Sequence, residues 1–203
     1  MNQSKLVSKI FIAFSFIILL NAHEVNAQGV KLVADVVHSN IGFSVSLGGG
    51  ITRITGKYND FNIIINYNDS DMTKTTIDAT IKSGSISTGA AARDEHLGTP
   101  DFFDVGKYPD ITFTSDSIRK STSGYVAYGT FQMHGVISKI ELPFLITGKD
   151  AEGSVGFSAR YIIKRSEYKI GKDSEHPSPN SYVSDNINVE IDFVAKKSKN
   201  PAK

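Results

Sequence analysis

The residues best suited to chemistry lie in one short charged stretch, where Arg93, Asp94 and His96 follow an alanine-rich run. A histidine beside a carboxylate is the orienting pair of general-base catalysis. On a helix, however, Asp94 and His96 are two residues apart and point about 200° away from each other. Arg93 and His96, three residues apart, share a face. This geometry favours a structural role, in which these residues cap the helix and tie it to the neighbouring strands, over catalysis.

The other candidate chemistry has less support in the spacing. The histidines form no HxH or HExxH motif, and no GxSxG sequence marks a serine nucleophile. The glycines at 48–50 lead into a strand pattern rather than a helix, which excludes a phosphate-binding loop. His134-Gly135 is typical of a strand end where glycine permits a bulge or turn. We therefore expect no cofactor and no metal, unless the fold brings together three distant histidines: His38, His96 and His134.

The first 27 residues have the pattern of a secretory signal peptide. Lys5 and Lys9 precede an apolar run at 10–20, and Val25-Asn26-Ala27 has the small residues of a cleavage site. The apolar run is shorter than the roughly 20 residues that span a bilayer. We expect cleavage after Ala27, a periplasmic or secreted protein, and residues 28–203 as a single domain with no membrane span.

Composition narrows the function classes further. The chain has no cysteine, which excludes a lipobox anchor, disulfides, a thiolate metal site and c-type haem. The net charge is +1, with 22 basic and 21 acidic residues, so nothing in the charge favours a nucleic-acid partner. The lysine-rich C-terminal end is short and carries no aromatic residues, which is typical of a solvated tail.

Beyond residue 28 the dominant pattern alternates apolar and polar residues, as in strands with one buried face. Turn-forming residues separate these runs, and only residues 90–98 have the pattern of a short helix. We count about eight to ten strands. The pattern predicts an all-β, antiparallel fold that closes into a barrel of about eight strands, because closure removes exposed strand edges.

About eight strands enclose a space just wide enough for side chains or one slim ligand. Small residues on the apolar faces either leave a cavity or fit the taper of a packed barrel, and the residues alone leave both interpretations open. Phe102, Phe103 and Tyr108 likewise predict either a plug at one barrel end or a gate to a cavity. The small residues in question are Ala79, Ala127, Gly129, Gly156 and Ala159.

The order of these features resembles the YceI-like family of periplasmic polyisoprenoid-binding proteins. The most specific part is residues 83–113, where a strand leads into the charged helix, the pair Phe102-Phe103 and a return strand after Tyr108-Pro109. The resemblance extends over about residues 32–195. One departure is Ser46, Leu47 and the three glycines, where the family often has a histidine. Further matching positions are Asp35, His38, Ser39, Ile41, Phe43, Gly56, Phe61, Gly129, His134, Gly135, Val136, Gly156, Phe157, Arg165, Gly171, Val183, Ser184 and Asp185.

The resemblance implies a lipocalin-like barrel with a cavity. It implies a non-enzymatic carrier that binds a long apolar isoprenoid-type lipid, either a polyisoprenoid or an isoprenoid quinone, and it permits a homodimer. Strand alternation then places the expected lipid-contacting side chains on the inside of the barrel. These residues are Phe43, Val45, Ala79, Ile81, Phe113, Phe131, Met133, Phe157 and Tyr161.

Two alternatives remain open from the sequence. One is an exported hydrolase or isomerase that uses His96 or His134. The other is a packed structural barrel that acts through its surface.

Overall fold

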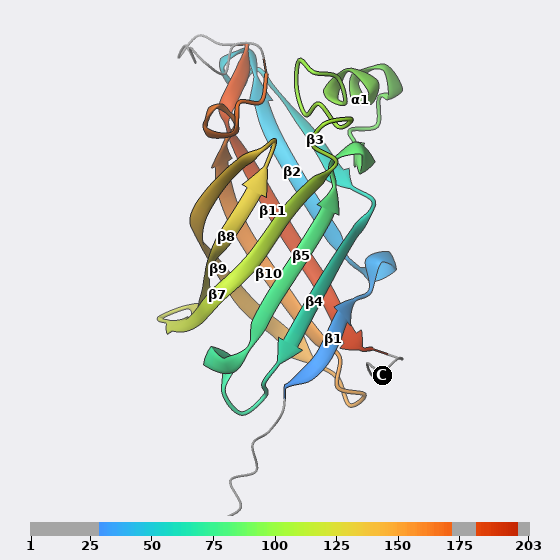
Figure 1. Ribbon diagram of the computed structural model, residues 1–203. Helices are drawn as coiled ribbons and strands as arrows, with labels where there is room; N and C mark the ends of the chain where they lie inside the picture. Colours follow the sequence, from blue (N-terminus) through green and yellow to red (C-terminus); the bar gives the residue numbers. More distant parts are fainter. Residues whose placement is uncertain (1–28, 172–181, 199–203) are drawn as a thin grey trace, which may run out of the picture.

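The computed structural model describes residues 29–171 and 182–198; the expected signal peptide and the expected turn at 172–181 lie outside this range. The described strands form one antiparallel sheet (Figure 1). They are β1 (Val30–Ala34), β2 (Asn40–Leu47), β3 (Thr52–Tyr58), β4 (Phe61–Tyr67), β5 (Thr76–Lys82), β6 (Ile86–Ser87), β7 (Asp110–Ser121), β8 (Gly124–Met133), β9 (Val136–Lys149), β10 (Val155–Lys164) and β11 (Val183–Lys197).

A ring of strands closes the sheet into a barrel. Its order is β1-β4-β5-β7-β8-β9-β10-β11, and β11 pairs back with β1. The predicted all-β barrel of about eight strands is therefore confirmed. The strands β2, β3 and β6 raise the wall at one end, where β2 pairs with β11, β3 with β2, and the short β6 with β3.

The extra strands are continuations of strands in the ring. Ala34 of β1 pairs with Ala195, and Asn40 of β2 pairs with Asp192 on the same edge of β11. The bend between β1 and β2 holds the 3-10 helix η1 (Val36–His38), and β5 and β6 are separated in the same way by η4 (Ser83–Ser85). The alternating pattern predicts about eight to ten strands rather than the eleven described, because such bends are not visible in a period-two pattern.

The single α-helix of the described chain, α1 (Ala91–Leu97), matches the helix expected near residues 90–98. It lies in the excursion between β6 and β7 and sits at the upper end of the barrel in Figure 1. The remaining short 3-10 helices are η2 (Gly48–Gly50), η3 (Met72–Lys74) and η5 (Arg165–Tyr168).

His134 and Gly135 form the two-residue turn between β8 and β9, which confirms the strand end predicted there. Both have positive φ, 49° and 75°, as a tight hairpin turn requires. A Cβ on Gly135 would lie 2.6 Å from the Tyr108 ring, so glycine also allows this ring to pack against the turn. Tyr108 thus packs beside His134, with ring centroids 4.5 Å apart.

Candidate functional site

The interior of the barrel holds a cavity of about 380 Å³. This volume falls within the range of ligand pockets, roughly 300–1,000 Å³. Apolar side chains from β2, β5 and β7 to β11 dominate its lining. All the side chains expected to contact lipid are among those that line it, although contact with a ligand stays a prediction: Phe43, Val45, Ala79, Ile81, Phe113, Phe131, Met133, Phe157 and Tyr161.

The cavity does not continue into the lower end of the barrel, where the side chains are packed solid. Leu32, Ile65 and Ile118 are at most 2% exposed, and none of them lines the cavity. Above them, the Phe157 and Phe193 rings stack with centroids 4.9 Å apart and line the cavity as its floor. The barrel is therefore packed at one end and hollow at the other, which answers the question that the small residues left open.

The small residues divide between these two regions. Ala79 and Ala159 line the cavity, whereas Ala127 is fully buried and does not. A Cβ on Gly129 would lie 2.4 Å from the Thr114 carbonyl oxygen, so this glycine allows close packing rather than leaving space. The interpretation of Ala127 and Gly129 as residues that make room for a ligand is wrong. Gly156 precedes the inward-facing Phe157 and would place a Cβ 2.4 Å from the Thr147 hydroxyl, so it does not make room either.

The upper end of the cavity is covered by α1 and the loop that follows it. His96 and Leu97 of the helix, together with Phe102 and Phe103, line the cavity. The Phe103 ring meets Tyr58 edge-on, with centroids 6.4 Å apart, and burial raises the pKa of the Tyr58 phenol. Phe102 and Phe103 thus lie where a gate or plug was expected, while Tyr108 packs at the β8–β9 turn instead.

Hydrogen bonds to Thr88 hold α1 in place. The Arg93 Nε donates to the Thr88 hydroxyl (2.6 Å), and an Asp94 carboxylate oxygen accepts from the Thr88 backbone N–H (2.8 Å) and hydroxyl (2.5 Å). Because Thr88 directly follows β6, these bonds tie the helix to the barrel wall. The predicted tie to the wall is confirmed for Arg93 and Asp94, but the predicted cap is wrong, because the N-cap residue is Ala90 and no side chain caps it. Nothing in the sequence pattern had singled out Thr88 as their partner.

The two histidines proposed for catalysis lie in different settings. His96 is about half exposed and lies 3.6 Å from a carboxylate oxygen of Asp101. The His134 Nδ1 donates to the backbone carbonyl oxygen of Tyr168 (2.9 Å), which joins the β8–β9 turn to η5. Within residues 29–171 and 182–198, no three histidine or acidic side chains are grouped to hold a metal ion, so His38, His96 and His134 do not form such a cluster.

Arg165 is a buried cation at the cavity wall that the residue pattern alone did not mark as a site residue. Its side chain is 3% exposed and lines the cavity. The guanidinium donates to the backbone carbonyl oxygens of Ile170 (3.0 Å), Val183 (3.1 Å) and Ser184 (3.2 Å). It therefore joins η5 to the start of β11, and the arginine of the family pattern was the only signal that pointed to it.

Comparison with known families agrees with this architecture. The sequence model of the YceI-like domain family matches residues 32–195. The chain belongs to the YceI-like family. A UPF0312 protein of Photorhabdus laumondii is 30% identical over 184 residues, which cover 89% of this chain and 93% of the relative.

Solved structures of similar proteins have the same fold. The YceI protein of Campylobacter jejuni is 33% identical, with a TM-score of 0.64, and the match covers 74% of this chain and 88% of that one. Burkholderia cenocepacia BcnA is 20% identical, with a TM-score of 0.72, and covers 80% and 99%. A polyisoprenoid-binding domain from Saccharophagus degradans is 14% identical, with a TM-score of 0.64, and covers 84% and 100%. At 20% and 14% identity, the last two show a shared fold alone.

None of the described helices has the length and apolar character needed to cross a bilayer.

Proposed function

We propose that this protein is an exported carrier that holds one long apolar isoprenoid-type lipid, a polyisoprenoid or an isoprenoid quinone, inside its barrel. The observation that carries the proposal is the cavity of about 380 Å³ with an apolar lining and a packed floor. Such a cavity can enclose a slim chain and gives it few polar partners. Support also comes from the Saccharophagus degradans domain of the same fold, which is a polyisoprenoid-binding domain.

The mechanism of binding would be removal of the chain from water. Each methylene buried in an apolar site contributes about 0.8 kcal/mol, so ten of them contribute about 8 kcal/mol, equivalent to micromolar affinity before ordering costs. Branched isoprenoid units suit a barrel lined by aliphatic and aromatic side chains from several strands. A carrier of this kind needs no cofactor.

The settings of His134, Arg93 and Asp94 favour a carrier over the hydrolase or isomerase alternative. The His134 ring bonds the backbone of η5, and Arg93 and Asp94 are occupied by Thr88. These contacts account for the charged residues near the cavity without assigning them a reaction.

The direct test is extraction of lipid from the purified mature protein, followed by mass spectrometry. We expect one isoprenoid-type lipid per chain. A lipid-free protein that also fails to bind added polyprenol or isoprenoid quinone in a saturable way would contradict the carrier function and favour the structural barrel.

Export is a separate part of the proposal, supported by the signal-peptide pattern of residues 1–27. The intact mass of the exported product is expected to correspond to a chain that begins at Gln28. A product that keeps residues 1–27 would indicate a membrane-tethered protein instead.

A further inference from the structure

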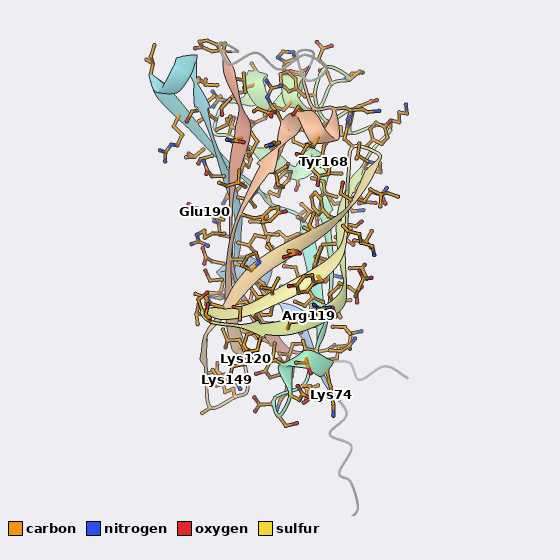
Figure 2. All side chains as sticks on the ribbon, turned by 90° about the vertical axis from the view of Figure 1, so that its left-hand side faces the viewer. Lys74, Arg119, Lys120, Lys149, Tyr168 and Glu190 are labelled. Carbon is orange, nitrogen blue, oxygen red and sulfur yellow. The ribbon has the colours of Figure 1, made fainter. Side chains whose placement is uncertain are left out.

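The barrel wall is not hydrogen-bonded along its full height between β9 and β10. These strands pair from Lys149 opposite Val155 up to Phe144 opposite Ala159, and the pairing ends there. Above this point β10 continues to Lys164 paired with β11, and the part of β9 that begins at Val136 is paired with β8. Figure 2 shows the two strands starting close together at the lower left and diverging upward. We call the space between their upper parts the β9–β10 wedge.

The cavity lies directly behind this wedge. Ile140 and Leu142 of β9 and Tyr161 and Ile163 of β10 line the cavity from the two sides of the wedge. They are only partly buried, whereas Phe144, just below, is buried. The apolar lining therefore reaches the wall at the height where the strands are no longer paired.

The outer surface around the wedge is also apolar in part. Ile137 of β9 and Ile162 of β10, both above the last paired residues, are 66% and 58% exposed. Single exposed hydrophobic residues need no explanation, but these two lie on the two strands that separate. A chain that passes between the strands would meet apolar side chains both outside and inside the wall.

The upper end of the wedge is closed by η5. The Tyr168 carbonyl oxygen accepts the hydrogen bond from His134, and the Tyr168 ring meets Phe131 edge-on at 5.4 Å between centroids. Tyr168 lies at the top of the wedge in Figure 2. The wedge is thus bounded by the paired strands below and by the contact between η5 and the β8–β9 turn above.

We propose that the β9–β10 wedge is the entrance through which a lipid chain passes into the cavity. This inference rests on the proposed carrier function and assigns its route. Widening the wedge breaks no backbone pairing between β9 and β10, since none exists there. The hydrogen bonds of Tyr168 with His134 and Ser138 hold only its upper boundary. Opening the upper end instead requires movement of α1, Phe102 and Phe103 and loss of the charge-assisted hydrogen bonds that Arg93 and Asp94 form with Thr88.

The test uses covalent links, which the absence of cysteine makes simple to introduce in pairs. Glu141→Cys with Ile162→Cys places two exposed thiols across the wedge, at positions that would be opposite if the pairing continued. A short bis-maleimide then joins them. The matched control is Leu145→Cys with Ser158→Cys, which joins the same strands where they are already paired.

A second link closes the alternative route under α1. A Cβ on Gly84 would lie 3.8 Å from the Cβ of Val105, the usual spacing in a disulfide. Gly84→Cys with Val105→Cys therefore ties the loop after α1 to η4, which directly follows β5. The probe for all variants is solanesol, a polyprenol, supplied in phosphatidylcholine vesicles, and both the rate of uptake and the final occupancy are measured.

We expect the link across the wedge to slow uptake at least about tenfold, while the control link and the 84–105 disulfide change the rate less than about twofold. Equal slowing by all the links, or slowing by the 84–105 disulfide alone, would overturn the wedge as the entrance. Because solanesol would still bind at equilibrium in either case, the carrier function would stand. If the unlinked proteins bind no solanesol at equilibrium, the carrier function itself fails, and the entrance fails with it.

Discussion

At the scale of single residues, alternation shows which side chains of a strand point into the barrel. It does not show how far along the barrel axis each of them lies. Ala79 and Ala127 both point inward, yet one lines the cavity and the other is packed in the solid region. The period-two pattern treats the two as equivalent. Whether space is left next to a small residue depends on side chains from strands that are distant in the sequence.

Replacing these two alanines with leucine is expected to give opposite results. Ala79→Leu should fill part of the cavity, so the amount of bound lipid falls while the free energy of unfolding is maintained. Ala127→Leu should overpack the solid region and lower the free energy of unfolding by about 1–3 kcal/mol. Lipid extraction and urea unfolding measure the two effects. Equal destabilisation by both variants would mean that the cavity is filled by side chains in solution.

Asp35 gives a prediction for acid stability. Hydrogen bonds from Lys196 (2.5 Å) and His38 (2.8 Å) lower the pKa of its carboxyl group to about 2, below the ordinary value of about 4. A lowered carboxyl pKa stabilises the fold above the ordinary value, and this contribution is lost as pH falls from about 4 through about 2. Asp35→Asn should therefore lower the thermal midpoint near neutral pH but change it little at pH about 2.

Thermal melts of both proteins across this pH range measure the effect. The matched control is Asp116→Asn, which removes an exposed ion pair with Lys139 and should change the midpoint little at any pH. A difference between Asp35→Asn and the wild type that stays constant down to the lowest pH would show that the charge of Asp35 is not the cause.

At the scale of elements, the strands and α1 were predictable because each has its own local pattern. The bend between β1 and β2, and the divergence of β9 from β10, were not. The sequence from Val136 to Pro143 continues to alternate, although this part of β9 is not paired with β10. Alternation records which side chains are buried, and it holds no information on which backbone groups are paired.

The attachment of α1 gives a prediction at this scale. Thr88→Val keeps the size of the side chain but removes the hydroxyl that bonds Arg93 and Asp94. Loss of about 1–2 kcal/mol should speed amide hydrogen exchange in residues 91–97 about five- to thirtyfold, with β7 and β8 unchanged. The control is Thr73→Val, which removes the hydrogen bond from the Thr73 hydroxyl to Asp71. Thr73 lies in η3, away from α1 in the sequence. Unchanged exchange in Thr88→Val would mean that apolar contacts of Leu97 hold the helix.

At the scale of the whole molecule, the barrel combines a packed region that gives stability with a hollow region that gives the site. The packed end contains Leu32, Ile65 and Ile118 and closes where β11 pairs back with β1. The hollow end lies where β2, β3 and β6 extend the wall and α1 covers it. The sequence predicted the barrel and the inward faces, but this division depends on contacts among all the strands.

This division predicts that lipid raises the stability of the whole barrel, because the folded state alone has the cavity. At a lipid concentration a hundredfold above the dissociation constant, the gain is about 2.7 kcal/mol, which corresponds to about 5–11 °C in the thermal midpoint of a domain of this size. Calorimetry of delipidated protein with and without solanesol measures it. Farnesol, a short isoprenoid alcohol, should give a smaller shift because fewer methylenes are buried. Occupancy of a site that exists in the folded state alone must raise the thermal midpoint. If solanesol stays bound through gel filtration but leaves the midpoint unchanged, it therefore binds outside the cavity.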